Sequence, residues 1–346
     1  MAEAYRVGII GCGGRGRAHW RGYQASGRCH LVAVADVNRA GAEAFVARVA
    51  EAEGPVAVYE DAARMLAEVK PDIVSVCTWP DTHAPLVLAA LTEGARAIFA
   101  EKPMAPTWGE AVRMGDAARR AGVPLLFCHQ RRFESQFVTA RRLLREGAIG
   151  PLTRVEATCD NLFDWGTHWF DMLHFFNEET PARWVLGQID VRAGRRVFGA
   201  LVEDQGLALV QFANGVQGLL ITGADRQSRE MIRLVGTDGV MEIQAVGPDG
   251  MVIPLRVRGR GDGGFHPVDV AGGVAPAEAG AVADLLRCLE SGDEPELSVE
   301  KALRATALIF ATYESSRRRG RVDLPLTIED SPLAAMVAAG VFGGGQ

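Results

Sequence analysis

The sequence predicts an α/β protein in which a doubly wound parallel sheet is followed by an α+β domain with a mostly antiparallel open sheet. Over the first 126 residues, short apolar runs alternate with helical segments, which is typical of parallel strands covered by helices on both faces. Further along, apolar runs are joined by Asn-Gly and Asp-Gly pairs, which favour hairpins. We therefore expect one domain over residues 1–126 and a second over 127–346, with a tail over 330–346 that either frames a subunit contact or is loose.

The most informative segment lies near the start of the chain. An apolar run over 7–10 precedes Gly11-Cys12-Gly13-Gly14-Arg15-Gly16, a helix to about residue 26, and a second apolar run over 31–35 that is closed by Asp36. In a G-x-G-x-x-G turn the glycines allow a tight turn, close approach to a pyrophosphate and close helix packing, while the helix N-terminus faces the phosphates. An acid twenty residues after the last glycine accepts hydrogen bonds from ribose hydroxyls. The segment predicts a Rossmann dinucleotide site; a glycine turn without a nucleotide is the alternative.

Asp36 also indicates which dinucleotide binds. A carboxylate at this position repels a 2′-phosphate, so it favours NAD over NADP. Arg39 follows three residues later, and its guanidinium could reach a phosphate if Asp36 turned away. The sequence therefore predicts NAD as the cofactor and places Arg39 beside the same ribose.

The rest of the first domain continues the alternation. Strands are expected over 56–59, 71–77, 95–100 and 124–128, separated by helices over 41–53, 61–69, 84–93 and 107–121. Ligands of such sheets bind beyond the carboxyl ends of the strands. The residues at those ends, where chemistry is expected, are Gly11, Asp36, Thr78, Glu101 and His129.

The second domain has a different pattern. Helices are expected over 133–146, 165–176, 277–291 and 298–316, and strands over 151–158, 207–212, 216–222, 231–235 and 240–243. Residues 245–275 are rich in glycine and resist assignment. These elements predict an open sheet with helices on one face, and the uncovered face predicts a homodimer or homotetramer built sheet to sheet.

Composition restricts the class of protein. The net charge of −6 over 346 residues argues against a nucleic-acid-binding surface. No apolar stretch approaches the length of a membrane span, and no signal peptide precedes the first strand. The six cysteines form no C-x-x-C pair and lie mostly in apolar runs, as expected of buried thiols in a reducing compartment. We therefore expect a cytoplasmic protein that binds neither nucleic acid nor membrane.

Four further motifs follow the glycine turn in order: Thr78-Trp79-Pro80-Asp81-Thr82-His83, Glu101-Lys102-Pro103, His129-Gln130-Arg131-Arg132-Phe133, and Asp164-Trp165-Gly166-Thr167-His168-Trp169-Phe170-Asp171. Together with Ala35-Asp36 and the segments at 313–316 and 322–325, they resemble the Gfo/Idh/MocA family, named for glucose–fructose oxidoreductase and inositol dehydrogenase. The resemblance covers residues 5 to about 326. It departs at Trp79, where the family commonly has proline. The resemblance implies an NAD(P)-dependent oxidoreductase whose cofactor lies near Thr78, Trp79, His83, Glu101 and Lys102.

Hydride transfer from a secondary alcohol needs a group that takes the hydroxyl proton. Asp164 and His168 are four residues apart at a helix start, so they share a face, and the carboxylate can orient the imidazole. Lys102 follows a parallel strand, where its ammonium could polarise a carbonyl or stabilise a developing alkoxide. The resemblance implies that Lys102, Asp164 and His168 form the catalytic set.

Other polar residues are open to two interpretations. Arg131 and Arg132 either bind a sugar hydroxyl or carboxylate, or pair with acids. His83 either caps a helix or lies near the cofactor. Asp171 is expected to be a supporting acid and His174 a structural histidine. No cluster with the spacing of a metal site is present in the sequence, so no metal is expected.

Together these features predict an NAD-dependent oxidoreductase that acts on a hydroxyl-bearing carbon of a sugar, an inositol-like polyol or a sugar derivative, in a cleft between the two domains. Two alternatives share the same motifs. One is a glycoside hydrolase that oxidises and re-reduces its sugar within one turnover. The other is a nucleotide-binding regulator without chemistry, which the presence of all three catalytic candidates argues against.

Overall fold

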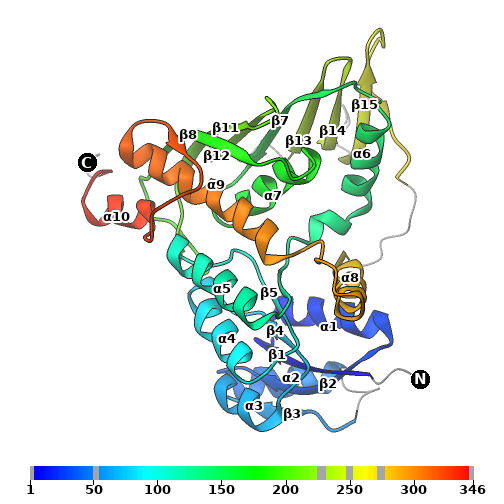
Figure 1. Cartoon of the computed structure of the whole chain (residues 1–346), viewed down its shortest axis with the longest axis vertical. Helices are drawn as coiled ribbons and strands as arrows, with labels where there is room; N and C mark the ends of the chain where they lie inside the picture. Colours follow the sequence, from blue (N-terminus) through cyan, green and yellow to red (C-terminus); the bar gives the residue numbers. More distant parts are fainter. Residues whose placement is uncertain (1–3, 50–53, 224–230, 247–251, 271–276, 343–346) are drawn as a thin grey trace. The chain divides into compact units, whose positions relative to one another are not determined.

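The computed structural model describes residues 4–49, 54–223, 231–246, 252–270 and 277–342 (Figure 1). The chain divides into two compact units, each described by itself below. The first consists of Met1–Phe133 with Val274–Leu303, and the second of Glu134–Gly273 with Arg304–Gln346.

The first unit is built on a six-stranded sheet in which every pair of neighbouring strands is parallel. Its order, β3-β2-β1-β4-β5-β6, is that of a dinucleotide-binding fold. Starting from β1, strands β2 and β3 are added on one side, and β4, β5 and β6 are then added on the other. The strands are β1 (Tyr5–Ile10), β2 (Cys29–Ala35), β3 (Ala57–Tyr59), β4 (Ile73–Val76), β5 (Ala97–Ala100) and β6 (Leu125–Phe127). This confirms the predicted parallel sheet.

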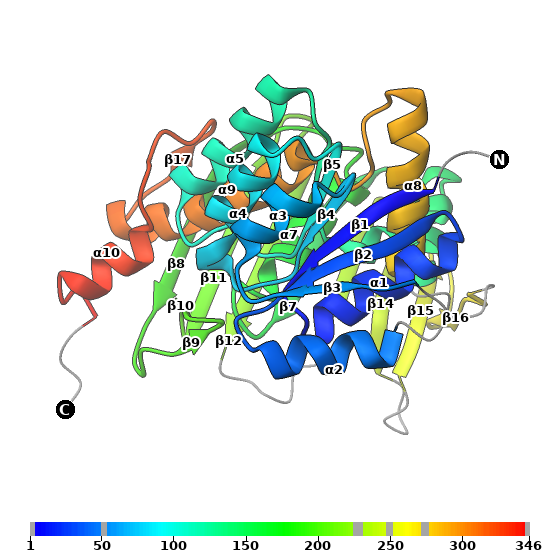
Figure 2. The ribbon, with the colours of Figure 1, turned by 90° about the horizontal axis from the view of Figure 1, so that it is seen from below.

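Helices cover both faces of this sheet, as Figure 2 shows. One core lies between the sheet and α3 (Ala62–Val69), α4 (Pro80–Thr92) and α5 (Trp108–Ala121). The other lies against α1 (Gly14–Ser26), α2 (Arg39–Val49) and α8 (Ala277–Ser291). Neighbouring strand residues enter opposite cores, Ile9 one and Ile10 the other, because successive side chains alternate across a strand.

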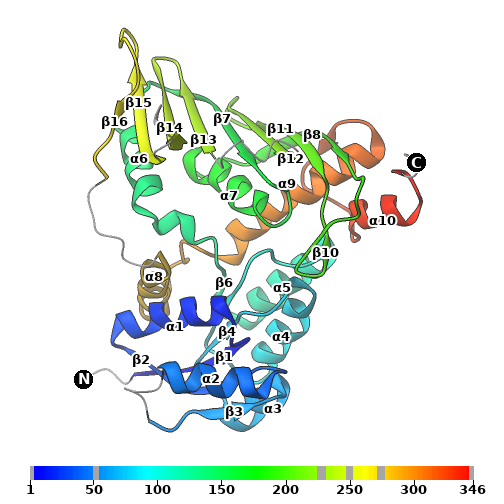
Figure 3. The ribbon, with the colours of Figure 1, turned by 180° about the vertical axis from the view of Figure 1, so that it is seen from behind.

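The second unit contains a nine-stranded sheet of order β16-β15-β14-β13-β7-β12-β11-β8-β17 (Figure 3). It is mostly antiparallel, as predicted, with one parallel pair, β7–β12. The strands are β7 (Leu152–Cys159), β8 (Ala182–Asp190), β11 (Gln205–Phe212), β12 (Gln217–Gly223), β13 (Met231–Gly236), β14 (Gly239–Val246), β15 (Val252–Gly259), β16 (His266–Pro267) and β17 (Val322–Asp323). The short strands β9 (Arg196–Val197) and β10 (Ala200–Leu201) pair separately.

Helix α7 (Gly166–Phe176) packs on β7 and β12, and α6 (Ser135–Arg145) packs on β14 and β15. Helix α9 (Val299–Arg318) continues past residue 303 and contacts β8, where Ser315 Oγ accepts the Gly187 N–H (2.8 Å). The short helix α10 (Pro332–Ala338) lies in the predicted tail. No helix in the described ranges combines the length and apolar character that crossing a membrane requires.

Two features differ from the sequence prediction. Strands β8 and β15 were not predicted, and β15 lies in the glycine-rich stretch that resisted assignment. In addition, the compact units place 127–133 and 274–303 with the parallel sheet, because α8 packs against α1 and against a short 3-10 turn at Gln130–Phe133. The functional division at residue 126 stays a prediction.

Candidate active site

The glycine turn joins β1 to α1, and two of its glycines leave no room for a side chain. Gly11 has a φ of +93°, and a Cβ there would lie 2.5 Å from the carbonyl oxygen of Cys77. A Cβ at Gly16 would lie 2.2 Å from the carbonyl oxygen of Gly11. These contacts bring the start of α1 directly against the turn, as close helix packing in a dinucleotide fold requires.

Gly13 differs from its neighbours. No described atom lies within 4 Å of a Cβ built at this position, and its φ of −75° suits any residue. Gly13 is also the N-cap of α1, and among the described residues no side chain caps the first turn of this helix. Open space beside a helix N-terminus fits a pyrophosphate, because the uncapped N–H groups and the helix dipole both favour an anion.

Asp36 follows β2 and is fixed by backbone donors. Its Oδ2 accepts the N–H of Cys12 (2.8 Å), and its Oδ1 accepts the N–H of Asn38 (2.9 Å). A carboxylate has about four acceptor positions, so it can still accept ribose hydroxyls. Arg39 is turned towards Glu43, with Nε 2.9 Å from Oε1. The turn and Asp36 therefore fit NAD.

Replacing Asp36 with serine should narrow the preference for NAD over NADP, because the carboxylate no longer repels the 2′-phosphate. The ion pair of Arg39 with Glu43 is half exposed, so it contributes at most about 1 kcal/mol. Arg39 can therefore leave Glu43 and bind the 2′-phosphate of NADP. Titration of both nucleotides against the wild type, D36S and D36S/R39A checks this. We expect D36S to gain NADP affinity and the double variant to lose that gain. Equal NAD and NADP binding by the wild type would contradict the assignment.

Residues after β4 lie against the glycine turn. A Cβ at Gly11 would approach Thr78 Cγ2 to 3.2 Å, so Thr78 lies beside the first glycine. Trp79 is the N-cap of α4, and its side chain is 57% exposed. His83 is buried, with Nδ1 3.1 Å from the Met104 carbonyl and Nε2 3.2 Å from that of Thr78, and burial lowers its pKa. Trp79 therefore offers an open apolar surface, whereas His83 ties α4 to the loop after β5.

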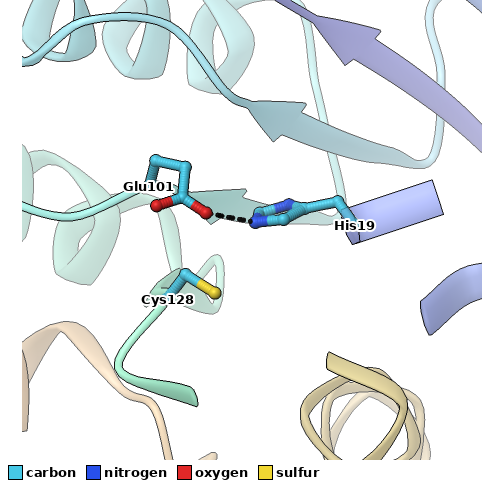
Figure 4. A group of neighbouring side chains, drawn as sticks. All are labelled: His19, Glu101 and Cys128. Carbon is cyan, nitrogen blue, oxygen red and sulfur yellow. Dashed lines mark hydrogen bonds and ion pairs between the residues drawn. The ribbon is translucent and has the colours of Figure 1, made fainter. Parts of the chain in front are cut away.

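Glu101 directly follows β5, is buried, and is the centre of a hydrogen-bond and ion-pair network (Figure 4). Its Oε1 lies 2.6 Å from Arg15 Nε and 3.0 Å from His19 Nε2, and its Oε2 accepts the N–H of Lys102 (3.2 Å). Arg15 also pairs with Glu278 of α8 (3.0 Å). Burial opposes ionisation of Glu101, but His19 and Arg15 outweigh it and lower its pKa to about 2. Arg15 and Glu101, predicted near the cofactor, thus lie in one ion-pair network that joins the glycine turn to the lysine-bearing loop.

The same network explains a group with metal-ligand chemistry. His19, Glu101 and Cys128 place one ligand atom each within 4.8 Å of one another. The Arg15 guanidinium stands among them, with Nη2 3.3 Å from Cys128 Sγ. Burial raises the pKa of the Cys128 thiol well above its usual value, so it is not the thiolate that a metal requires. The positively charged group in this cluster is therefore the Arg15 guanidinium of the protein itself.

Replacing Glu101 with glutamine should destabilise the fold by about 3 kcal/mol at pH 7, because its pKa is about 2 against an ordinary 4.5. A lowered pKa contributes stability above pH 4.5, and that contribution is lost as the pH falls towards 2. The difference between wild type and E101Q should therefore shrink over this range. Urea unfolding from pH 7 to pH 3 checks it, with E290Q, which removes an exposed pair with Arg28, as the control. A difference that does not change with pH would contradict the prediction.

Lys102 lies two residues after β5 and precedes Pro103, to which it is joined by a cis peptide bond. Its backbone is held by Glu101, as described above, and its side chain is partly exposed. Lys102 therefore lies at the carboxyl edge of the parallel sheet, which is also the edge that carries the glycine turn.

In the second unit, Asp164 lies two residues before α7 and His168 lies within it, and all residues of α7 are buried. Asp164 is 7% exposed, His168 3% and Asp171 1%. The His168 N–H donates to the Trp165 carbonyl (3.1 Å), so His168 lies in the first turn of the helix. Burying a carboxylate and an imidazole is costly, so their concentration on one buried helix and the turn before it marks a candidate functional site.

Arg131 and Arg132, which lie near the end of the first segment of the first unit, are buried. Arg132 has a side chain with no exposed surface, and its Nη1 lies 2.9 Å from Glu296 Oε1. Burial raises the pKa of Glu296, but Arg132 and Lys301 outweigh it and lower that pKa. Arg131 is 7% exposed. Arg132 thus pairs with an acid, and binding of a sugar hydroxyl or carboxylate by Arg131 and Arg132 stays a prediction.

Three residues to which the sequence assigned no role have contacts or an exposure that suggest one. His19 bonds Glu101; Val37, next to Asp36, is 91% exposed; and Glu203 is buried near the start of α7. His19 lies three residues after Gly16, on the buried face of α1, and that spacing was the available signal. Nothing in the local sequence around Glu203 marks it.

Comparison with known proteins decides the family. Residues 5–129 match the model of the oxidoreductase family with an NAD-binding Rossmann fold, and residues 160–242 match that of the GFO/IDH/MocA C-terminal domain. The chain belongs to the Gfo/Idh/MocA family. It is therefore an NAD-binding oxidoreductase, as the motifs predicted.

Two curated Gfo/Idh/MocA relatives match nearly the whole chain. D-apiose dehydrogenase of Paraburkholderia graminis is 28% identical, over 98% of this chain and 94% of its own. Inositol 2-dehydrogenase of Rhizobium meliloti is 27% identical, over 92% of this chain and 99% of its own. An NAD-binding oxidoreductase of Klebsiella pneumoniae has a similar crystal structure, with a TM-score of 0.79 and 22% identity over 94% of this chain and 100% of its own. That similarity shows the fold.

Proposed function

We propose that this member of the Gfo/Idh/MocA family is a dehydrogenase of a hydroxyl-bearing carbon in a sugar, an inositol-like polyol or a sugar derivative. The observation that carries the proposal is similarity over nearly the full chain to relatives named for D-apiose and for inositol. The buried pair of Asp164 and His168 supports it, because oxidation of an alcohol needs a base within a site that excludes water.

Each residue has a distinct role in this proposal. NAD, when bound, supplies the nicotinamide that takes up or returns the hydride. His168 takes the hydroxyl proton during oxidation and returns it during reduction, and Asp164 orients the imidazole. Lys102 stabilises the oxygen as negative charge develops on it. Val37 offers an apolar surface to the adenine ring, because its exposed side chain follows the ribose-binding Asp36.

A substrate panel tests the proposal. Purified protein, first checked for retained nucleotide, is assayed for NADH formation with sugars, inositols and sugar acids. We expect stoichiometric NADH from a subset of them, and deuterium at the reacting carbon should appear in free NADH. Glycoside cleavage with only catalytic NAD would indicate the redox-cycling hydrolase instead. NAD binding with neither product would indicate the regulator.

We also propose a homo-oligomer formed through the outer face of the nine-stranded sheet. Leu186, Leu207 and Ile221 are 45%, 44% and 47% exposed on β8, β11 and β12. Leu207 lies opposite Ile221 in the ladder, so their side chains adjoin on one face. A second copy offers the same surface, as a two-fold interface requires. The free, mostly buried cysteines support the cytoplasmic location proposed with it.

Replacing Leu207 with glutamate should reduce the oligomeric state, because the new charge would have to be buried in the interface. Light scattering coupled to size exclusion measures the mass, and circular dichroism confirms that the variant is folded. V138E is the matched control, since Val138 is 47% exposed on α6, away from the sheet face. An L207E variant with the wild-type mass would contradict the proposed interface.

A further inference from the structure

Glu203 is an acid that nothing in the proposed chemistry uses, and yet it is fully buried in the second unit. It lies between β10 and β11, and three donors from three places in the chain converge on it. Leu162 N–H (2.6 Å) and Thr222 Oγ1 (2.9 Å) bond Oε1, and Tyr313 Oη (2.8 Å) bonds Oε2. All three groups can donate to a carboxylate, which offsets part of the cost of its burial, although burial still raises the pKa of Glu203.

The Leu162 N–H belongs to the turn that begins α7. Asn161 Oδ1 accepts the Asp164 N–H (2.6 Å), and the Asn161 carbonyl accepts the Gly166 N–H (2.7 Å). Asp164 is therefore tied to Asn161, which is the immediate neighbour of Leu162. A change in the position of Leu162 would move the turn that carries Asp164 and leads to His168.

The side chain of Leu162 is fixed at the same place as its N–H. A Cβ at Gly206 would lie 2.9 Å from Leu162 Cδ1 and 2.8 Å from Thr222 Oγ1, so the glycine on β11 leaves the room that both side chains occupy. Tyr313 reaches Glu203 from α9, from the 313–316 segment that the sequence resemblance singled out. The turn is thus connected through one carboxylate to β12 and to α9.

We propose that Glu203, supported by Tyr313, is a positioning residue that holds the turn before α7 so that Asp164 and His168 keep their productive geometry. This inference rests on the proposed function, because it takes Asp164 and His168 as the groups that act on the substrate. Glu203 touches neither substrate nor cofactor in this proposal. Its effect passes through the Leu162 N–H and the turn.

Four variants separate positioning from general stability. E203A removes all three hydrogen bonds and leaves the Leu162 N–H without its acceptor. E203Q keeps an acceptor oxygen for that N–H, and its amide can donate to the Tyr313 hydroxyl. E242A is the matched control: Glu242 is 1% exposed on β14, but it bonds Arg233 (2.6 Å) and Arg256 (2.7 Å) instead of the turn. Y313F removes one hydroxyl and keeps the fold testable if E203A does not fold.

We expect E203A to lower kcat by about tenfold or more with little change in the Kd of NAD, and E203Q to stay within about threefold of wild type. Y313F should fall between them, and E242A should keep wild-type kcat. Hydrogen exchange needs no substrate, and it should accelerate at 161–168 in E203A and Y313F but not in E242A.

A double-mutant cycle gives the decisive readout. If Glu203 acts through Asp164, E203A should have little further effect on kcat in a D164A background. Additive effects, wild-type kcat in both E203A and Y313F, or equal losses in E203A and E242A would each overturn the inference. Full activity of D164A alone would overturn the proposed function instead, and the exchange data would then still decide whether Glu203 holds the turn.

Discussion

Replacing Lys102 or His168 with alanine should lower turnover by about two orders of magnitude or more, the usual scale of a lost acid or base. NAD affinity should change much less in both variants, because the phosphates are expected at the glycine turn and the ribose at Asp36. Single-turnover measurement of NADH formation, with a separate NAD titration, distinguishes the two effects.

Two variants, one just before α7 and one within it, make this result interpretable. D164N should lower turnover less than H168A if Asp164 only orients the imidazole, and equally if it also contacts the reacting hydroxyl. D171N is the control, since Asp171 is also a buried acid, 1% exposed, and we expect it to play only a supporting role. Wild-type turnover in both K102A and H168A would contradict the catalytic assignment.

The parallel sheet could be predicted because its signals are local. Each strand is a short apolar run followed by a helix with its own start signal, such as Asp61, whose side chain accepts the N–H groups of Ala63 and Arg64 at the start of α3. Strand β15 has no such signal, because it is followed by a glycine-rich loop instead of a helix, and on its described part Arg256 and Arg258 interrupt the apolar run of Leu255 and Val257. Its place in the sheet comes from pairing with β14, which only the fold supplies.

The candidate site also shows that only local features could be predicted from the sequence. The glycine turn and Asp36 form one local unit, so sequence spacing was sufficient to predict their proximity. Arg15, by contrast, was predicted near the cofactor from its place in the turn, but its guanidinium pairs with Glu101 and Glu278, which are 86 and 263 residues away. Glu203 likewise bonds Tyr313 across 110 residues. Such pairs depend on tertiary structure, so no local pattern could reveal them.

Substitutions in the glycine turn should also have large effects, on NAD binding at one position and on stability at another. Two of the glycines are needed for different reasons. Gly16 is required by the protein itself, since a Cβ there would lie 2.2 Å from the Gly11 carbonyl oxygen. Gly13 has no described neighbour within 4 Å of its Cβ position, and its φ of −75° is open to alanine. If a pyrophosphate approaches the turn at Gly13, a methyl group there obstructs the ligand and not the fold.

G13A should therefore weaken NAD binding by about tenfold to a hundredfold while changing stability by no more than about 1 kcal/mol, the cost of alanine at an N-cap. G16A should lower stability by about 1–3 kcal/mol or more, as forced overpacking does, and should lose NAD binding as a consequence. Urea unfolding without nucleotide, together with calorimetric NAD titration, separates the two. If G13A binds NAD as tightly as the wild type, the dinucleotide does not lie against this turn, and the functional assignment of residues 11–16 fails.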